Sequence, residues 1–416
     1  MKLSRRNVLR TAAAGAGALA LGNWTSAFGQ SNPIRIGVIL PLSGPASLLG
    51  NDFRTGAEIA AAQLNRAGGV LGRQVELVFR DDRANPNDAI AAARELTGSG
   101  INLLVGGLLV GPTLATVPVL PQLNAVFITV ATITMSLTHE NFVRNAFRVS
   151  DNDYEQLRAI VRLAVEKFPN VTSWGCALYD LQALTDSWAL FKKLLPEAYS
   201  KIGKTVSFVE PIPAKLGVGD FKNQINALMN SPAEGLLSMV FGQDGITFFQ
   251  QARTFGLPGK LKAIIDRGNE FPFAKALKKN IPANFWALSP WNQSLYPDVA
   301  LSRALYQDYV ALTKDTHPSG FVANGFNPIM AYAQAITAAK GATDTATIIN
   351  TLEGRTIQSA KGPLTFRKED HQAIKDVVYL NIAPSDDETG FKVAGGVRFN
   401  GAELLEPPTP GVAFKP

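Results

Sequence analysis

The chain of 416 residues contains one cysteine and three histidines. Cys176 has no second cysteine to pair with, so no intrachain disulfide can form. His139, His317 and His371 stand far apart, and the chain has no Cys-x-x-Cys or His-x-x-x-His spacing of the kind that holds structural zinc. The sequence therefore predicts a protein without disulfides and without a metal site.

The usual signatures of catalysis are also absent. There is no Gly-x-Ser-x-Gly elbow and no Gly-x-x-x-x-Gly-Lys-Ser/Thr loop. The segment Gly15–Ala20 fits a dinucleotide fingerprint, but arginines precede it where a strand is needed. Asp81 and Asp82 are adjacent at the end of an apparent strand, where neighbouring side chains point to opposite faces. The sequence indicates no enzyme and no cofactor, and a protein that holds a ligand is favoured.

The N-terminus has the features of an export signal. Arg5 and Arg6 precede an uncharged run at residues 11–22, and a small-residue processing site follows near Gly29. Twelve residues in a helix span about 18 Å, too little for a membrane core of about 30 Å. Residues 1–29 are predicted to be a twin-arginine-type signal peptide, removed near Gly29 in the periplasm. No cysteine stands beside the site to carry a lipid, so no direct membrane anchor is expected.

Charge excludes one class of partner. The formal net charge is +6, but Lys2, Arg5, Arg6 and Arg10 of the signal supply four of these charges. Because the remaining chain is close to neutral, it lacks the basic surface that nucleic-acid binding requires.

Beyond the signal, short apolar runs alternate with segments of helical periodicity. Such alternation predicts α/β architecture with mostly parallel sheets covered by helices. "NPNDAIAAARELTGSG" begins with an Asn-Pro helix start, and a polar cluster at residues 150–153 predicts a second one. The predicted strands are Ile34–Leu40, Val75–Phe79, Leu103–Val105, Val126–Val130, Thr172–Leu178, Val206–Val209, Leu236–Phe241, Leu261–Ile265 and Phe285–Leu288.

The alternation occurs in two rounds, one over residues 33–148 and one from there to about residue 288. Two such rounds predict two lobes. Because ligands bind beyond the carboxyl ends of strands in open α/β sheets, the two lobes should enclose a cleft. Helices are predicted over Val299–Lys314, Val322–Lys340 and Thr345–Leu352, followed by β-like segments.

A family resemblance supports this interpretation. "IRIGVILPLSG", "GGVLGRQVELVFRDD", "NAFRVSDND", "FFQQARTFGL", "NPIMAYAQAITAAK" and "GPLTFRKEDHQ" resemble the type I periplasmic solute-binding proteins of ABC importers, most of all the leucine/isoleucine/valine branch. The resemblance implies a two-lobed Venus-flytrap fold with three crossovers, near residues 149–152, 289–292 and 362–364. Residues 33–149 with 292–362 would form the N-terminal lobe, and 150–290 with 363–416 the C-terminal lobe.

The resemblance also implies a solute, an ABC permease as partner, and a monomer. The solute would be a branched-chain or other hydrophobic amino acid, with a compact aromatic or aliphatic organic acid or an amide as the alternative. Leu109, Val110 and Leu184 replace polar residues of the family and favour a less polar solute. A first alternative is a ligand-sensing domain, which would differ from a transport protein only in having a signalling partner instead of a permease. A second is an enzyme on the same scaffold, for which the sequence shows no identifiable nucleophile.

The candidate ligand-binding residues follow predicted strands in both lobes. Backbone groups of the loop at residues 43–47 and of Ala131, with the Thr132 hydroxyl, would meet a carboxylate. Glu270 or Asp244, with Asp266 behind them, would meet an ammonium group, and Arg267 would instead be the counter-ion of an organic acid. The aromatic clusters around Phe241 and Trp291 are interpreted mainly as core. The full set is Ser43, Gly44, Ser47, Leu109, Val110, Val130, Ala131, Thr132, Tyr179, Leu184, Gln243, Asp244, Asp266, Arg267 and Glu270.

Overall fold

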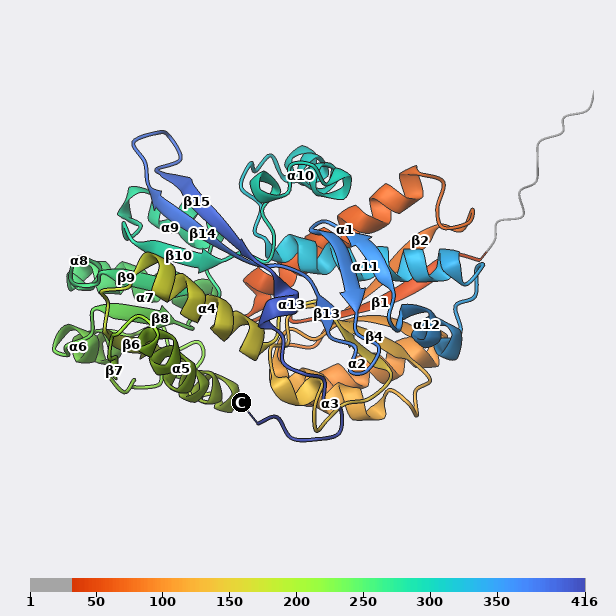
Figure 1. Ribbon diagram of the computed structural model, residues 1–416. Coiled ribbons are helices and arrows are strands. Elements are labelled where there is room, and N and C mark those ends of the chain that lie inside the picture. The colour runs from red at the N-terminus through yellow and green to blue at the C-terminus, as the bar shows by residue number, and fades with distance from the viewer. Residues whose placement is uncertain (1–31, 416) are drawn as a thin grey trace, which may run out of the picture.

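The computed structural model describes residues 32–415. Figure 1 shows two lobes side by side, with the C-terminal segment passing between them. The predicted signal peptide lies outside the described residues. Within the described chain the strands form three sheets, of five, seven and three strands. The two-lobed α/β architecture predicted from the sequence is confirmed.

The first lobe is built on the five-stranded sheet, in which every neighbouring pair is parallel. Its strands in chain order are β1 (Ile34–Leu40), β2 (Val75–Asp81), β3 (Leu103–Gly106), β4 (Val126–Thr129) and β5 (Ala146–Arg148). They lie in the order β2-β1-β3-β4-β5. The helices of this segment are α1 (Ser47–Arg66), α2 (Pro86–Gly98) and α3 (Val110–Thr116), with 3₁₀ turns η1 (Val117–Val119) and η2 (Met135–Leu137).

The helix starts follow the expected chemistry. Asn85 caps α2, its side chain accepting from the backbone of Asn87 and Asp88, and Pro86 occupies the first turn. Asp82 accepts from the backbone of Ala84 in the loop before this helix. Asp81 Oδ1 accepts from the backbone of Leu42 and Arg83, so both adjacent carboxylates at the end of β2 organise backbone turns.

The second lobe is built on the seven-stranded sheet. Its strands in chain order are β6 (Ser173–Ala177), β7 (Ser207–Phe208), β8 (Gly235–Ser238), β9 (Ala263–Asp266), β10 (Phe285–Leu288), β14 (Val377–Pro384) and β15 (Phe391–Phe399). Strands β6 to β10 pair in parallel, while β14 and β15 complete one edge in antiparallel fashion. The surrounding helices are α4 (Asp153–Lys167), α5 (Gln182–Ser200), α6 (Lys222–Met229), α7 (Gly242–Thr254), α8 (Leu257–Lys260) and α9 (Phe271–Leu277), with η3 (Lys278–Asn280).

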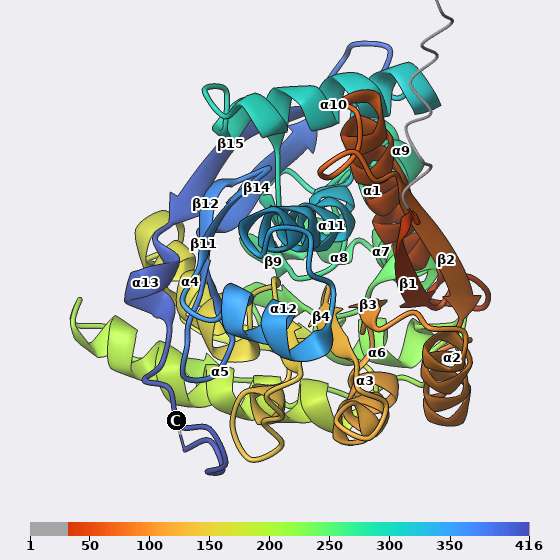
Figure 2. The ribbon, with the colours of Figure 1, turned by 90° about the vertical axis from the view of Figure 1, so that its right-hand side faces the viewer.

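The segment after β10 returns to the first lobe. It contains η4 (Gln293–Leu295), α10 (Ala300–Thr313), α11 (Phe321–Ala338), α12 (Thr345–Leu352) and the small sheet of β11 (Thr356–Ser359), β12 (Gly362–Phe366) and β13 (Ala373–Ile374). Figure 2, which faces the first lobe, shows α11 beside α1. Glycines permit this close contact: a Cβ on Gly56 would lie 1.8 Å from the Val322 carbonyl oxygen, and one on Gly325 would lie 1.9 Å from that of Phe53.

The small sheet contacts the first lobe. Gln334 of α11 exchanges two hydrogen bonds, each of 2.9 Å, with the backbone of Gln358 in β11. The Asn327 side chain accepts from the backbone of Ala360 at 3.0 Å. The lobe boundaries predicted from the sequence stay predictions, and these contacts lead us to propose that the third crossover follows Ile374.

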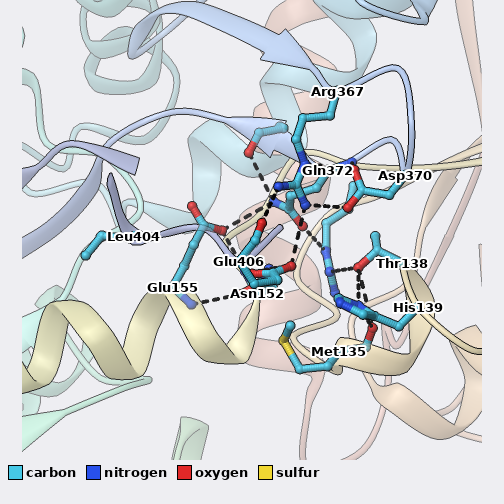
Figure 3. A network of polar contacts seen from close by, with 12 residues as sticks. Met135, Thr138, His139, Asn152, Glu155, Arg367, Asp370, Gln372, Leu404 and Glu406 are labelled. Carbon is cyan, nitrogen blue, oxygen red and sulfur yellow. Dashed lines mark hydrogen bonds and ion pairs between the residues drawn. The ribbon is translucent and has the colours of Figure 1, made fainter. Parts of the chain in front are cut away.

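A buried polar network joins the segments that connect the lobes (Figure 3). Arg148 donates to the Gln372 side chain at 2.5 Å. Asn152, which caps α4, donates to both carboxylate oxygens of Glu406 at 3.0 Å. Glu406 follows the last helix, α13 (Gly401–Leu404). The C-terminal segment therefore belongs to the interlobe connection, because its Glu406 carboxylate accepts hydrogen bonds from Asn152 in another segment that connects the lobes.

Candidate functional site

A cavity of about 460 Å³ lies between the two lobes. Its wall is formed largely by loops that follow β3 and β4 of the first sheet and β6, β8, β9 and β10 of the second. Both sheets therefore present the carboxyl ends of their parallel strands to one space, as expected for a ligand site in α/β proteins. Its size falls in the range of small-molecule sites.

Most of the wall is apolar. The first lobe contributes Leu108 to Pro112, which include the start of α3, and the second lobe contributes Leu181 to Leu184 at the start of α5. The remaining apolar residues come mainly from the strand-end loops. They are Leu49, Ala84, Pro86, Ala131, Ile133, Leu216, Met239, Phe241, Gly268, Leu288, Pro290 and Phe321.

The lining also has six polar residues: Ser150, Asp151, Gln156, Gln182, Arg267 and Asn324. Arg267 is 8% exposed and is fixed on two sides. Its Nη2 donates to Asp153 Oδ1 at 2.7 Å and to Gln156 Oε1 at 2.6 Å, and its Nε donates to Gln156 Oε1 at 3.0 Å. Its Nη1 contacts the Met239 sulfur at 3.4 Å. Because sulfur is a weak acceptor, Nη1 keeps donor capacity for a ligand.

Asp151, the carboxylate of the lining, already has a partner. It forms a buried ion pair with Lys375. Burial by itself would raise the pKa of Asp151, but the ammonium groups of Lys375 and Lys361 lower it below its usual value. Glu155 nearby behaves oppositely, because burial raises its pKa to about 8. Asp151 is therefore an ionised group whose charge is balanced within the protein.

Five of the fifteen candidate residues line this cavity: Leu109, Val110, Ala131, Leu184 and Arg267. Val130 and Thr132 flank Ala131 but are fully buried. The Thr132 hydroxyl donates to the Gly107 carbonyl at 2.7 Å and lies 2.6 Å from the Thr113 hydroxyl. The Thr132 hydroxyl is therefore engaged by groups of the protein itself. Contact of any of the fifteen candidate residues with a solute stays a prediction.

The carboxylates expected to meet an ammonium group are placed elsewhere. Asp244 accepts from the backbone of Gly217 at 2.6 Å. Asp266 accepts from the backbone of the next loop, and burial raises its pKa to about 6. Glu270 accepts from Ser319 and from the backbone of Gly320. Each of these three carboxylates accepts hydrogen bonds that stabilise a loop or a contact between the lobes, and none of them lines the cavity.

The loop at residues 43–47 also lies off the cavity lining. Ser43 and Gly44 are exposed and Ser47 is half-buried. The neighbouring Pro45 reaches toward the second lobe, where Cβ atoms on Gly217 and Gly242 would lie within 3.4 Å of it. The loop therefore contacts the second lobe through Pro45. Of the two remaining candidates, Gln243 is exposed and the Tyr179 hydroxyl bonds to the Phe241 carbonyl.

Sequence reasoning missed several lining residues, including Phe241, Met239, Ser150, Gln156 and Asn324. Phe241 and Met239 follow β8, so their position after a strand was the available signal. Asn324 lies on α11 and Gln156 on α4, and nothing in the local sequence places a helical residue at a cleft. Phe241 packs against the core, as its aromatic cluster suggested, and also forms part of the cavity wall.

Comparison with known proteins identifies the family to which the chain belongs. A family model described as periplasmic binding protein matches residues 33–387, and the chain belongs to that family. Membership of this family implies export of the protein to the periplasm. Within residues 32–415, no helix is both long and apolar enough to cross a bilayer, and no three His, Cys, Asp or Glu side chains are grouped to hold a metal ion.

Individual relatives agree with this class. The Leu/Ile/Val-binding protein homolog 3 of Brucella melitensis is 24% identical over 341 residues, or 80% of this chain and 87% of the relative. The structure of LivJ from Streptococcus pneumoniae with isoleucine has a TM-score of 0.75 at 21% identity, covering 88% of this chain and 99% of that one. A solute-binding protein of an ABC transporter from Rhodopseudomonas palustris with 3,4-dihydroxybenzoic acid also has a TM-score of 0.75, at 19% identity, covering 89% and 98%.

Proposed function

We propose that this protein captures a small solute with an apolar body between its lobes and delivers it unchanged to an ABC permease in the inner membrane. The cavity carries the proposal, because it lies where the strand ends of both sheets meet and is lined mainly by apolar side chains. The two structural neighbours hold solutes of two chemical classes, isoleucine and 3,4-dihydroxybenzoic acid, and the cavity of this chain has the size of a small-molecule site.

The residues of the lining support a role in binding rather than catalysis. Within the described chain it contains no histidine, cysteine, lysine or tyrosine. Ser150 offers its one hydroxyl, and Asp151 is neutralised by Lys375. An acid–base pair needs two groups free to exchange protons at the substrate. The proposal includes a monomer without a membrane anchor, exported by the signal at residues 1–29 through Arg5 and Arg6.

A thermal-shift panel tests the function. Amino acids, aromatic acids, aliphatic acids and amides are each added to the purified mature protein. A ligand at 100 times its dissociation constant stabilises the folded state by about 2.7 kcal/mol, which raises the melting temperature by a few degrees. Mass spectrometry should recover that ligand unchanged. A ligand converted to product would contradict the proposal, as would the absence of any shift across the panel.

A further inference from the structure

Resting on the proposed function, we infer that the solute is an apolar organic anion with a carboxylate and no ammonium group, and that Arg267 is the residue that selects it. The evidence is the distribution of charge at the polar end of the cavity. The apolar lining favours a ligand with an apolar body. The charge of that ligand depends on which polar groups of the lining already have partners within the protein.

The first observation concerns a donor that the protein leaves in part unused. Asp153 and Gln156 hold Arg267 through Nε and Nη2, which fixes the plane of the guanidinium group. Its Nη1 meets the weakly accepting sulfur of Met239. A guanidinium group fixed in this way binds a carboxylate with little loss of side-chain entropy. Arg267 thus offers a preorganised site for one anionic group.

The second observation is an unsatisfied hydroxyl on the same wall. Ser150 is 3% exposed, and its Oγ has no hydrogen-bond partner among the described residues. A buried hydroxyl without a partner costs free energy, and a ligand oxygen at this end of the cavity would remove that cost. Ser150 and Arg267 both line the cavity, and a rotamer of Ser150 that turns its hydroxyl toward the cavity would add a second donor for a ligand oxygen.

The third observation is that the lining has no unpaired carboxylate for an ammonium group. Asp151 is engaged by Lys375, and Asp244, Asp266 and Glu270 lie off the lining. Lys361 is a further buried cation that acts on Asp151, and its Nζ donates to the Asp376 carbonyl. An ammonium ion would meet Arg267 as the charged group of the lining that keeps an unused donor, and would lose its water without gaining an unpaired carboxylate.

Four ligands with one carbon skeleton test this charge preference by isothermal titration on the wild-type protein. They are 4-methylpentanoate, 4-methylpentanamide, L-leucine and L-leucinamide. Phenylacetate, phenylacetamide, phenylglycine and phenylglycinamide repeat the test on an aromatic skeleton. On the better skeleton, we expect the acid to bind at least about tenfold more tightly than the neutral amide and the amino acid, or ~1.4 kcal/mol. The positively charged amide should bind worst.

Variants then assign the preference to Arg267. Arg267→Gln should reduce the acid-to-amide ratio to less than about threefold while the amide keeps its own affinity, because the amide does not depend on the positive charge. Arg267→Lys should retain part of the ratio. Arg66→Gln, at an exposed arginine outside the cavity, is the matched control and should change neither affinity. If Arg267→Gln does not fold, the wild-type ligand series still decides the ligand class.

Two outcomes are distinguishable. Binding of L-leucine or phenylglycine as tight as that of the matching acid would overturn the inference and leave solute capture intact, as would an unchanged acid-to-amide ratio in a folded Arg267→Gln protein. Absence of binding by all eight compounds would overturn the ligand class, and the broader thermal-shift panel would then decide the function separately.

Discussion

Arg267 Nη2 lies 2.7 Å from Asp153 Oδ1, and both side chains are more than nine-tenths buried. Arg267 directly follows β9, whereas Asp153 is the first residue of α4. The backbone N–H of Asp153 also donates to the Ile133 carbonyl of the first lobe at 2.8 Å. One ion pair therefore fixes a cavity-lining arginine to the point where the chain enters the second lobe.

Removing the charge of Asp153 should destabilise the protein strongly. Asp153→Asn leaves Arg267 buried without a counter-ion, a change that typically costs about 3–5 kcal/mol. Urea denaturation of the ligand-free protein measures the loss. Asp308→Asn is the matched control, because Asp308 pairs with the exposed Arg66 and should cost less than about 1 kcal/mol. Equal losses in the two variants would contradict the assignment.

Glu270 should make stability depend on pH. Burial raises its pKa to about 8 in the folded protein, although bonds from Ser289, Gly320 and Ser319 act to lower it, against an ordinary value of 4.5. The folded state therefore binds more protons than the unfolded state between these pH values, and stability falls as pH rises from about 4.5 to about 8.

Glu270→Gln should weaken this dependence. The difference in unfolding free energy between pH 5.5 and pH 7.5 is expected to shrink by on the order of 2 kcal/mol. Denaturation at the two pH values measures it, with Glu76→Gln on the exposed face of β2 as the control. An unchanged difference would show that Glu270 does not carry a raised pKa.

Glu406 should couple the C-terminal segment to the interlobe connection. Glu406→Ala leaves the Asn152 amide without its two 3.0 Å bonds and removes the carboxylate beside Arg367. A buried donor left unpaired costs about 1–3 kcal/mol. Hydrogen exchange should show faster opening at the start of α4, where Asn152 is the cap. Glu403→Ala, which removes an exposed carboxylate paired with Arg162, should leave that exchange unchanged.

Much of the fold could be predicted from the sequence because its signals are local. The apolar run at Ile34–Leu40 is a strand with the predicted bounds, and Asn85 and Asn152 cap helices where polar clusters precede periodic segments. The predicted strand Val206–Val209 is shorter, at Ser207–Phe208, because it lies at the edge of its sheet with one neighbour.

The site was less predictable because it depends on contacts between distant segments. All four of Ala131, Arg267, Asp244 and Asp266 follow predicted strands, so the sequence suggested each of them equally as a ligand-binding residue. Only tertiary structure separates them, since Asp244 is engaged by Gly217 and Asp266 by its own loop. The engagement of Asp151 by Lys375, 224 residues later in the chain, is likewise invisible to local patterns.

Isothermal titration of an Ala131→Trp variant tests most directly whether the interlobe cavity is the solute site. Ala131 lines the cavity beyond β4, and an indole there would occupy a large part of a space of about 460 Å³. With the solute that binds the wild-type protein most tightly, the variant should bind at least about 100-fold more weakly, or ~2.8 kcal/mol. Ala338→Trp, at the exposed end of α11, should bind as the wild type does. An Ala131→Trp protein that keeps both its fold and wild-type affinity would show that the solute binds elsewhere.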